Sequence, residues 1–241
     1  GKKALPVIVS SGGSTLADIE TALAILGRED VTLLHCITCY PAPEKEYNLR
    51  LLQTLGAVFG IETGVSDHSL DPVLVPSLAC AMGGSMLEKH ITLSKATDGL
   101  DDPVALEPDQ FALMCHCVHQ SMAVLRHYGR EQGQKEIIAQ LEADDSYAEG
   151  LVQAALGDGI KRLAPAEQAN YGRTNRSLHF MHAMKKGDRI GAGDIGVLRT
   201  EKVLTPGISP LYLEEVTGAL LASDAAAGEG LQWAHLVNRD A

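Results

Sequence analysis

Short apolar runs alternate with helical patterns over the first ninety residues. Four runs have the length and composition of buried strands: residues 6–10, 31–36, 63–66 and 86–90. Between them, apolar residues recur at helical spacing, with Thr15 as an N-cap and Pro72 as a first helical position, so helices are expected over residues 16–26, over 49–59 and from about 72. Repeated strand–helix units with nearly continuous apolar strands predict parallel strands covered by helices.

The pattern changes in the second half of the chain. Residues from about 108 to 156 are expected to be mostly helical, with a charged, solvated face near residues 131–145. After Gly157, glycines separate short apolar runs, which is typical of a small β-rich domain. We therefore expect two domains, residues 1–168 and residues 169–241.

Composition narrows the function classes. The 241 residues carry a net charge of −11, which argues against non-specific nucleic-acid binding, because such binding neutralises phosphates with Lys and Arg. No run of about eighteen apolar residues exists, so no membrane-spanning segment is expected. The five cysteines are an odd number in a long chain, which favours reduced thiols and a cytoplasmic location.

Polar residues fall where each predicted strand ends. The ends carry Ser10, then His35 to Thr38, then Ser66 to His68, and finally Glu88 and His90. In parallel α/β barrels, these ends and the loops after them build the active site. The pattern therefore predicts that the polar groups converge on one region.

His68 and His90 end neighbouring strands, so their imidazoles could reach one metal ion. Two protein ligands leave positions open for substrate oxygens and water, as Lewis-acid catalysis requires. Glu88 shares the strand face of His90, where it could orient a ligand or accept a proton. The alternative is that one His is only a hydrogen-bonded polar residue at a strand end.

The cysteines suggest a zinc site that their spacing does not favour. Cys36 and Cys39 resemble half a zinc knuckle, but strand residues three apart point to opposite faces. On a helix, Cys115 and His119 share a face that Cys117 does not. Small buried thiols are the preferred interpretation.

Several motifs resemble the N-acetylneuraminate (sialic acid) synthase family, in order and across nearly the whole chain. They are His35 to Pro43 with Asn48-Leu49-Arg50, Ser66-Asp67-His68, Glu88-Lys89-His90 with Thr92-Leu93, and residues 99–108. Arg173, Arg176-Ser177-Leu178, Lys186-Gly187 and residues 207–210 resemble the family's C-terminal antifreeze-like (SAF) domain. The resemblance implies the C-terminal half of a (β/α)8 TIM-type barrel followed by a small β-rich SAF domain.

Members of this family condense phosphoenolpyruvate with an N-acetylated amino sugar such as N-acetylmannosamine, giving a nonulosonic acid and phosphate. The resemblance implies that His68 and His90 bind the divalent metal, Mn²⁺ or Mg²⁺, that polarises the sugar aldehyde. It places Asp101 near the metal and the sugar, and we expect Asp101 and Glu88 to be the catalytic residues. It also assigns substrate binding to five residues: Ser10 and Ser66 at the phosphate, Tyr40 in the sugar pocket, Thr38 where the family often has Asn or Ser, and Arg199 from the partner subunit of a domain-swapped homodimer.

Three departures from the family pattern are visible. Asp102 and Ala105 stand where the family usually has His and Ser, which predicts a change in sugar preference, and the stretch from Arg199 to Gly207 is longer than the family turn. The chain resembles only about the last four of the eight barrel units. We therefore expect a fragment that alone binds phosphoenolpyruvate poorly and turns over little.

Three alternatives remain open at this point. The chain could belong to a synthase for a legionaminic or pseudaminic acid. It could be a non-catalytic fragment that dimerises or binds carbohydrate through its SAF domain, since fold alone does not set function. It could also be an unrelated metal-dependent barrel aldolase, which the SAF resemblance disfavours.

Overall fold

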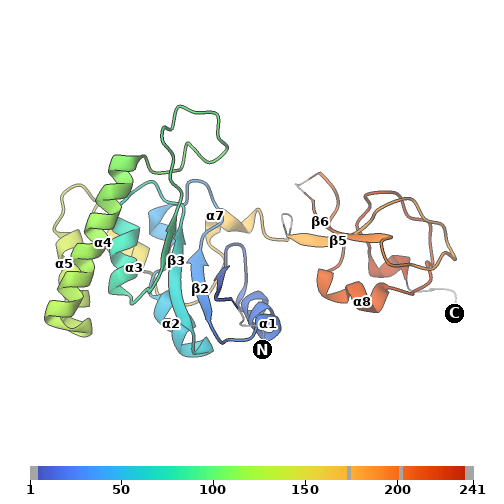
Figure 1. The fold of residues 1–241 in the computed structure, drawn as a ribbon, viewed down its shortest axis with the longest axis horizontal. Coiled ribbons are helices and arrows are strands. Elements are labelled where there is room, and N and C mark those ends of the chain that lie inside the picture. Colours follow the sequence, from blue (N-terminus) through green and yellow to red (C-terminus); the bar gives the residue numbers. More distant parts are fainter. Residues whose placement is uncertain (1–4, 173–174, 201–202, 237–241) are drawn as a thin grey trace. The chain divides into compact units, whose positions relative to one another are not determined.

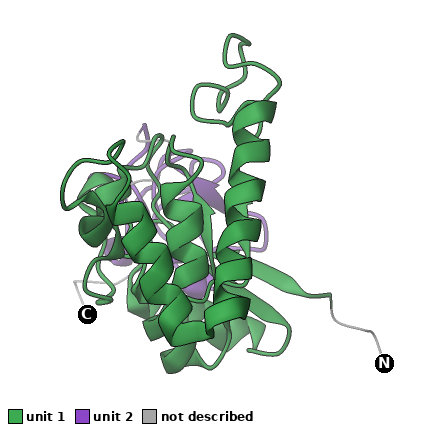
Figure 2. Cartoon of the chain, turned by 90° about the vertical axis from the view of Figure 1, so that its left-hand side faces the viewer, with its two compact units in different colours: residues 1–168 green, residues 169–241 purple. Residues whose placement is uncertain are grey.

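The protein is described here from a computed structural model that covers residues 5–172, 175–200 and 203–236. Arg173 of the SAF-like motif, and residues 201–202 of the stretch after Arg199, lie outside these ranges. The chain divides into two compact units, residues 1–168 and 169–241 (Figure 2). Each unit is described by itself.

The first unit is built on a four-stranded parallel sheet with the strand order β1-β2-β3-β4 (Figure 1). Its strands are β1 (Val7–Ser10), β2 (Val31–Cys36), β3 (Glu62–Asp67) and β4 (Leu87–Lys89). In the register of the sheet, Cys36 pairs with Ser66 and Ser66 pairs with Glu88. The predicted parallel α/β arrangement is confirmed, whereas membership of an eight-stranded barrel stays a prediction.

Helices connect the strands and cover the sheet (Figure 1). They are α1 (Leu16–Leu26), the 3₁₀ turn η1 (Glu44–Glu46), α2 (Leu51–Phe59), α3 (Leu74–Ala81), α4 (Pro108–Tyr128), α5 (Arg130–Glu142), α6 (Leu151–Leu156) and α7 (Pro165–Gln168). The long loop between β4 and α4 extends from the N-terminal end of α4 (Figure 2). Among the described helices, none is long and apolar enough to span a bilayer.

Local hydrogen bonds decide where the helices begin. Thr15 caps α1 as predicted, in a reciprocal capping box with Asp18. α3 begins at Leu74 rather than at Pro72, because Oδ1 of Asp71 accepts from the N–H groups of Val73 and Leu74 at 2.7 Å each. α2 likewise begins two residues later than expected.

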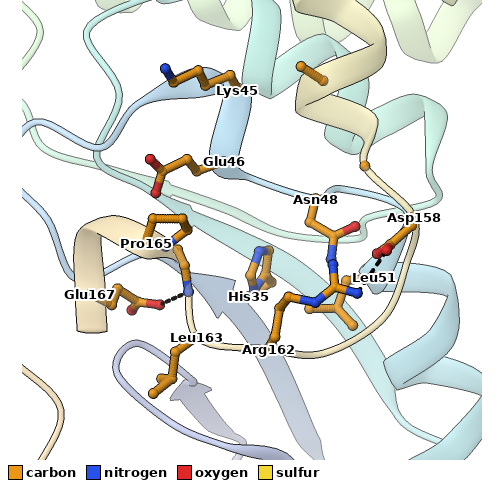
Figure 3. A pocket seen from close by; sticks show the side chains of 13 residues that line it. His35, Lys45, Glu46, Asn48, Leu51, Asp158, Arg162, Leu163, Pro165 and Glu167 are labelled. Atoms are coloured by element: carbon orange, nitrogen blue, oxygen red, sulfur yellow. Dashed lines mark hydrogen bonds and ion pairs between the residues drawn. The ribbon is translucent and has the colours of Figure 1, made fainter.

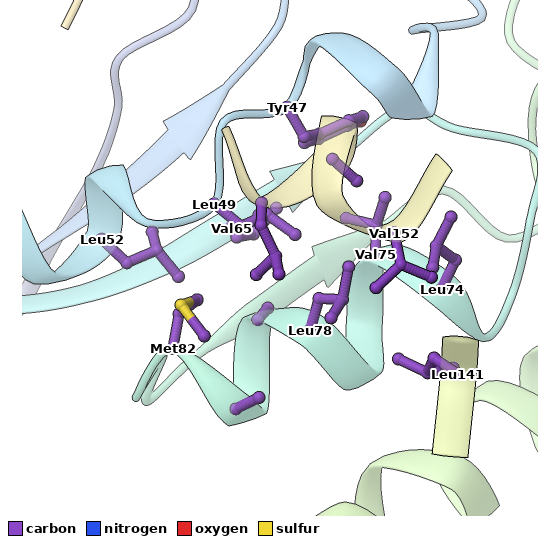
Figure 4. Close-up of a cluster of buried hydrophobic side chains, with 14 of the residues drawn as sticks. Tyr47, Leu49, Leu52, Val65, Leu74, Val75, Leu78, Met82, Leu141 and Val152 are labelled. Atoms are coloured by element: carbon purple, nitrogen blue, oxygen red, sulfur yellow. The ribbon is translucent and has the colours of Figure 1, made fainter. Parts of the chain in front are cut away.

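The helix-covered face of the sheet holds two buried clusters. One lies between β1, β2, α1 and α2 and includes Ile19, Leu33 and Phe59. The larger one joins β3 and α3 to α5 and α6, with Val65 and Leu78 fully buried within it (Figure 4). Burial of this kind stabilises the folded state by about 25 cal/mol for each Å² of apolar surface. It fixes the helices against the sheet whose carboxyl ends carry the polar residues.

The second unit contains a two-stranded antiparallel sheet, β5 (Arg176–Phe180) and β6 (Ile195–Arg199). Short helical turns complete it: η2 (Pro210–Tyr212), α8 (Leu213–Val216) and η3 (Trp233–His235). Leu178, Phe180 and Leu231 form its own core. Within its described residues, further strand pairing takes the form of isolated bridges, such as Met184 with Ala225.

Candidate active site

One row of side chains crosses the face of the sheet opposite the helices. Cys36, Ser66 and Glu88 are register partners, so their side chains project to the same side. The Ser66 hydroxyl donates to Oε1 of Glu88 at 2.7 Å. Burial raises the pKa of the Cys36 thiol, against hydrogen bonds from Ser10, Ser66 and Thr38, so the thiol stays protonated and lies among three hydroxyls. The structure therefore brings Ser10, Thr38, Ser66 and Glu88 together in one region at the carboxyl ends of the strands.

His68 lies next to this row, and each of its ring nitrogens faces a polar partner. Nδ1 lies 2.8 Å from the carbonyl oxygen of Ile37, which can only accept, so Nδ1 carries the proton. The Nε2 lone pair faces the Tyr40 hydroxyl at 3.2 Å, and the two rings stack with centroids 4.2 Å apart. Burial lowers the pKa of His68, which leaves the imidazole neutral at pH 7 and competent as a ligand.

His90 completes the pair from the end of β4. Its ring centroid lies 5.3 Å from that of His68 and 5.7 Å from that of Tyr40. Oδ2 of Asp101 lies 3.5 Å from Nδ1 of His90, which directs Nε2 away from the carboxylate. Both imidazoles thus have Nδ1 held by an oxygen, the arrangement that orients metal-ligating histidines.

The donor set fits a metal held by two protein ligands. Imidazole nitrogens are ligands that suit Mn, Fe, Co, Ni or Zn. Among the residues that the structure describes, no group of three or more His, Cys, Asp and Glu side chains is placed to hold a metal. His68 and His90 are therefore the metal-ligand candidates that the site geometry brings together.

A buried ion pair lies behind the site, on the helix-covered face. Nζ of Lys89 lies 2.7 Å from Oδ2 of Asp67, with 1% and 0% of the side chains exposed. Oδ1 of Asp67 accepts from the Tyr47 hydroxyl at 2.7 Å and from the N–H of Ser69 at 2.8 Å. The same Tyr47 hydroxyl accepts from the N–H of His68 at 2.8 Å, so this network supports a predicted ligand.

Asp67 and Lys89 are not predicted as site residues, although the alternation of side chains along the strands indicates where they point. Each is the middle residue of a triplet whose outer residues face the site, and side chains alternate along a strand. Two opposite charges at matched positions of neighbouring strands indicate a pair on the other face. A second missed residue, Glu167, has no such local signal, because its hydrogen-bond partners Gly13 and Thr38 are distant in sequence.

Other predicted residues have different surroundings. Arg199 ends β6 and is exposed in the second unit. The Asp102 carboxylate is used within its own loop, where it accepts from the Thr97 hydroxyl and from the N–H of Gly99. Ala105 is buried, with 2% exposed.

The cysteines differ in how far they are buried, and only two of them match the expected small buried thiols. All five are free, Cys36 and Cys80 are buried, and the other three are half-buried. No zinc cluster involves them within the described ranges.

A separate pocket of about 480 Å³ lies on the other face of β2 (Figure 3). Its lining includes His35, Glu46, Arg162 and Glu167, and none of the predicted site residues. His35 and Cys36 are consecutive in β2, so they point to opposite faces of the sheet. Burial lowers the pKa of His35 to about 4, with a further contribution from the charge of Lys161.

Comparison with known proteins gives consistent matches for both units. Residues 1–130 match the NeuB family and residues 175–237 match the SAF domain. The chain is 32% identical to N,N'-diacetyllegionaminic acid synthase of Campylobacter jejuni over 219 residues, covering 89% of this chain and 55% of that protein. It is 27% identical to pseudaminic acid synthase of Helicobacter pylori, covering 88% of this chain and 53% of that protein.

A solved structure supports the same assignment. The spore coat polysaccharide biosynthesis protein SpsE of Bacillus subtilis superposes with a TM-score of 0.76 and 26% identity, covering 98% of this chain and 62% of that chain. This chain therefore spans between 53% and 62% of the lengths of these three proteins. The matches exclude an unrelated barrel aldolase and confirm the resemblance seen in the motifs. The chain belongs to the NeuB family.

Proposed function

We propose that this chain carries the metal-binding part of a nonulosonic acid synthase, which condenses phosphoenolpyruvate with an N-acetylated amino sugar, consumes one water molecule and releases phosphate. The observation that supports it best is the pair of imidazoles of His68 and His90, 5.3 Å apart at the ends of neighbouring parallel strands. The names of the relatives support the same class of reaction.

In this proposal, Nε2 of His68 and Nε2 of His90 bind Mn²⁺ or Mg²⁺. When bound, the metal supplies Lewis acidity toward the aldehyde oxygen of the sugar, so that the enol carbon of phosphoenolpyruvate can attack. Asp101 orients His90 through Nδ1, at the 3.5 Å separation seen here. Glu88 accepts a proton, and its hydrogen bond from Ser66 holds its carboxylate toward the site.

The hydroxyl groups around Cys36 take the substrate-binding roles. Ser10 and Ser66 bind the phosphate of phosphoenolpyruvate, and the proximity of both to the Cys36 thiol supports a shared subsite. Tyr40 lines the sugar pocket with a ring that is 48% exposed and stacked on His68. Thr38 lies at the same strand end.

The amino sugar is N-acetylmannosamine or a related diacetamido sugar. The name of one relative, N,N'-diacetyllegionaminic acid synthase, favours a diacetamido sugar. Asp102 stands where the family usually has His. Its carboxylate accepts hydrogen bonds from Thr97 and Gly99 within its own loop, so this position differs from the family pattern. Both sugars therefore belong in the assay.

Arg199 is proposed to reach the N-acetyl group in the site of a partner subunit within a domain-swapped homodimer. Light scattering of the purified chain tests the dimer directly, and a monomer at every accessible concentration would contradict it. The alternative is a non-catalytic SAF-containing fragment, which predicts carbohydrate binding without metal dependence.

Metal binding by the 241-residue chain is the first test. Isothermal titration with Mn²⁺ is expected to show one site, which His68→Ala and His90→Ala each weaken by at least about ten-fold, because half of the protein ligands are lost. His119→Ala, an exposed histidine of α4, is the matched control and should bind as the parent does. Equal affinity in all four proteins would contradict the proposed metal site.

Turnover is the second test. Phosphate release from phosphoenolpyruvate is measured with Mn²⁺ and each amino sugar, on this chain and on the longest natural reading frame that contains it. We expect sugar-dependent release in the longer protein and little in the chain alone. The absence of release in both proteins, with every sugar, would contradict the proposed reaction.

A further inference from the structure

The Glu167 carboxylate joins two loops that are far apart in sequence. Glu167 lies in α7 with 1% of its surface exposed. Its Oε1 atom accepts from the N–H of Gly13 at 2.6 Å and from the N–H of Thr38 at 2.7 Å. These two residues belong to the loops that follow β1 and β2, so one oxygen atom sets the separation of both loops.

The conformation of this side chain is set by its own helix. Oε2 of Glu167 accepts from the N–H of Ala164 at 3.2 Å, and the N–H of Glu167 donates back to the Ala164 carbonyl at 2.9 Å. A glutamate at the third helical position that reaches back to the residue before the helix is half of a capping box. Figure 3 shows this bond at the edge of the pocket. The local cap leaves Oε1 directed at the two loops.

The two loops are also packed against each other. A Cβ atom placed on Gly12 would overlap Oγ1 of Thr38 and would lie 2.9 Å from Sγ of Cys36. The backbone of the first loop therefore touches the second loop with no intervening space. A small change in their separation would displace Thr38 and the strand end that carries Ser10.

Charge supports the same arrangement. A buried carboxylate requires several donors or a counter-charge, and hydrogen bonds from backbone N–H groups stabilise its charged form. Burial lowers the pKa of Lys161, while the charge of Glu167 acts in the opposite direction. Within the described ranges, Nζ of Lys161 is buried without a hydrogen-bond partner. Its charge therefore acts on Glu167 through space.

We propose that Glu167 is a positioning residue that holds the loops after β1 and β2 at a fixed separation and thereby sets the geometry of Ser10 and Thr38. This inference rests on the substrate-binding roles proposed for those two residues. It assigns a part in the site to the segment immediately before the second unit.

The test compares Glu167→Ala with a matched control, Glu46→Ala. Oε2 of Glu46, in η1, accepts from the N–H of Ala166 at 2.9 Å, so it anchors the same helix without accepting from Gly13 or Thr38. Amide hydrogen exchange at Gly13 and Thr38 is followed by NMR, and phosphoenolpyruvate affinity is measured in the longer reading frame. Loss of a hydrogen bond to a charged acceptor is expected to accelerate exchange at both amides at least about ten-fold in Glu167→Ala.

The control should leave both exchange rates unchanged. Glu167→Gln should have a smaller effect than Glu167→Ala, because its amide oxygen still accepts from both loops. Phosphoenolpyruvate affinity should fall about ten-fold in Glu167→Ala relative to Glu46→Ala.

Unchanged exchange in Glu167→Ala, or equal acceleration in the two alanine variants, would overturn the proposal. Faster exchange with unchanged affinity would also overturn it, because the loops would then move without consequence for binding. If the parent protein does not bind phosphoenolpyruvate, the proposed function fails, while the exchange comparison still decides whether Glu167 holds the loops.

Discussion

Replacement of Lys89 by methionine should destabilise the first unit strongly. The change keeps an unbranched side chain of similar length and removes its charge, which leaves the Asp67 carboxylate buried without its cation. With 1% and 0% of the two side chains exposed, solvent cannot screen the loss. Lys89 also donates to the carbonyl oxygen of Ser69 at 2.5 Å, and this acceptor loses its partner as well.

The expected cost is about 3–5 kcal/mol, the range for removing one partner of a buried ion pair. Asp67→Asn alone should also be destabilising, since it leaves the ammonium unpaired. The double variant should lose less than the sum of the two, by about 1–3 kcal/mol, because it leaves no uncompensated charge.

Urea unfolding followed by far-UV circular dichroism measures these differences. Trp233 is the only tryptophan of the sequence and lies in the second unit, so its fluorescence reports on that unit separately. Lys135→Met is the matched control, since Lys135 forms an exposed pair with Glu131. This control should leave the midpoint unchanged. A cost below about 1 kcal/mol for Lys89→Met, or strict additivity in the double variant, would refute the reasoning.

Two further predictions concern the other face of β2 and the first loop. Because burial lowers the pKa of His35 from 6.5 to about 4, the unfolded chain binds a proton that the folded chain does not between these values. The free energy of unfolding should therefore be free of this proton-linked penalty above pH 6.5 and should fall by about 2 kcal/mol between pH 7.5 and pH 5. Urea titrations of His35→Gln should show a weaker dependence of the unfolding free energy on pH. An unchanged pH dependence would contradict the assignment. Gly12→Ala should cost about 1–3 kcal/mol in thermal unfolding, because its Cβ would overlap Thr38, whereas Gly56→Ala in α2, with its nearest contact at 3.6 Å, should be neutral or stabilising. Equal effects of the two alanines would show that packing at Gly12 is not limiting.

Much of the first unit follows from local pattern alone. The four strands and the cap of α1 are predictable because apolar runs and a capping residue act over a few positions. The start of α3 is less predictable, because it depends on the Asp71 side chain, which accepts from the N–H groups of Val73 and Leu74. The convergence of His68 and His90 is predictable from parallel strands.

The residues that support the site are harder to predict. Glu167 contacts residues more than a hundred positions away, and no spacing rule links them. In the second unit, apolar runs between glycines predict strands, but only backbone pairing decides whether a run becomes a ladder or a single bridge such as Arg189 with Leu220. Local preference is weaker than tertiary context there.

The alternation within the two triplets also has a consequence for how the strands align. Asp67 and Lys89 are register partners, as are Ser66 and Glu88. A slip of β4 by one residue would turn Glu88 into the apolar helix layer and Lys89 toward the histidines. A slip by two residues would restore the faces but separate the buried charges. The ion pair therefore fixes the register of β4 against β3, and this register sets the distance between the two imidazoles.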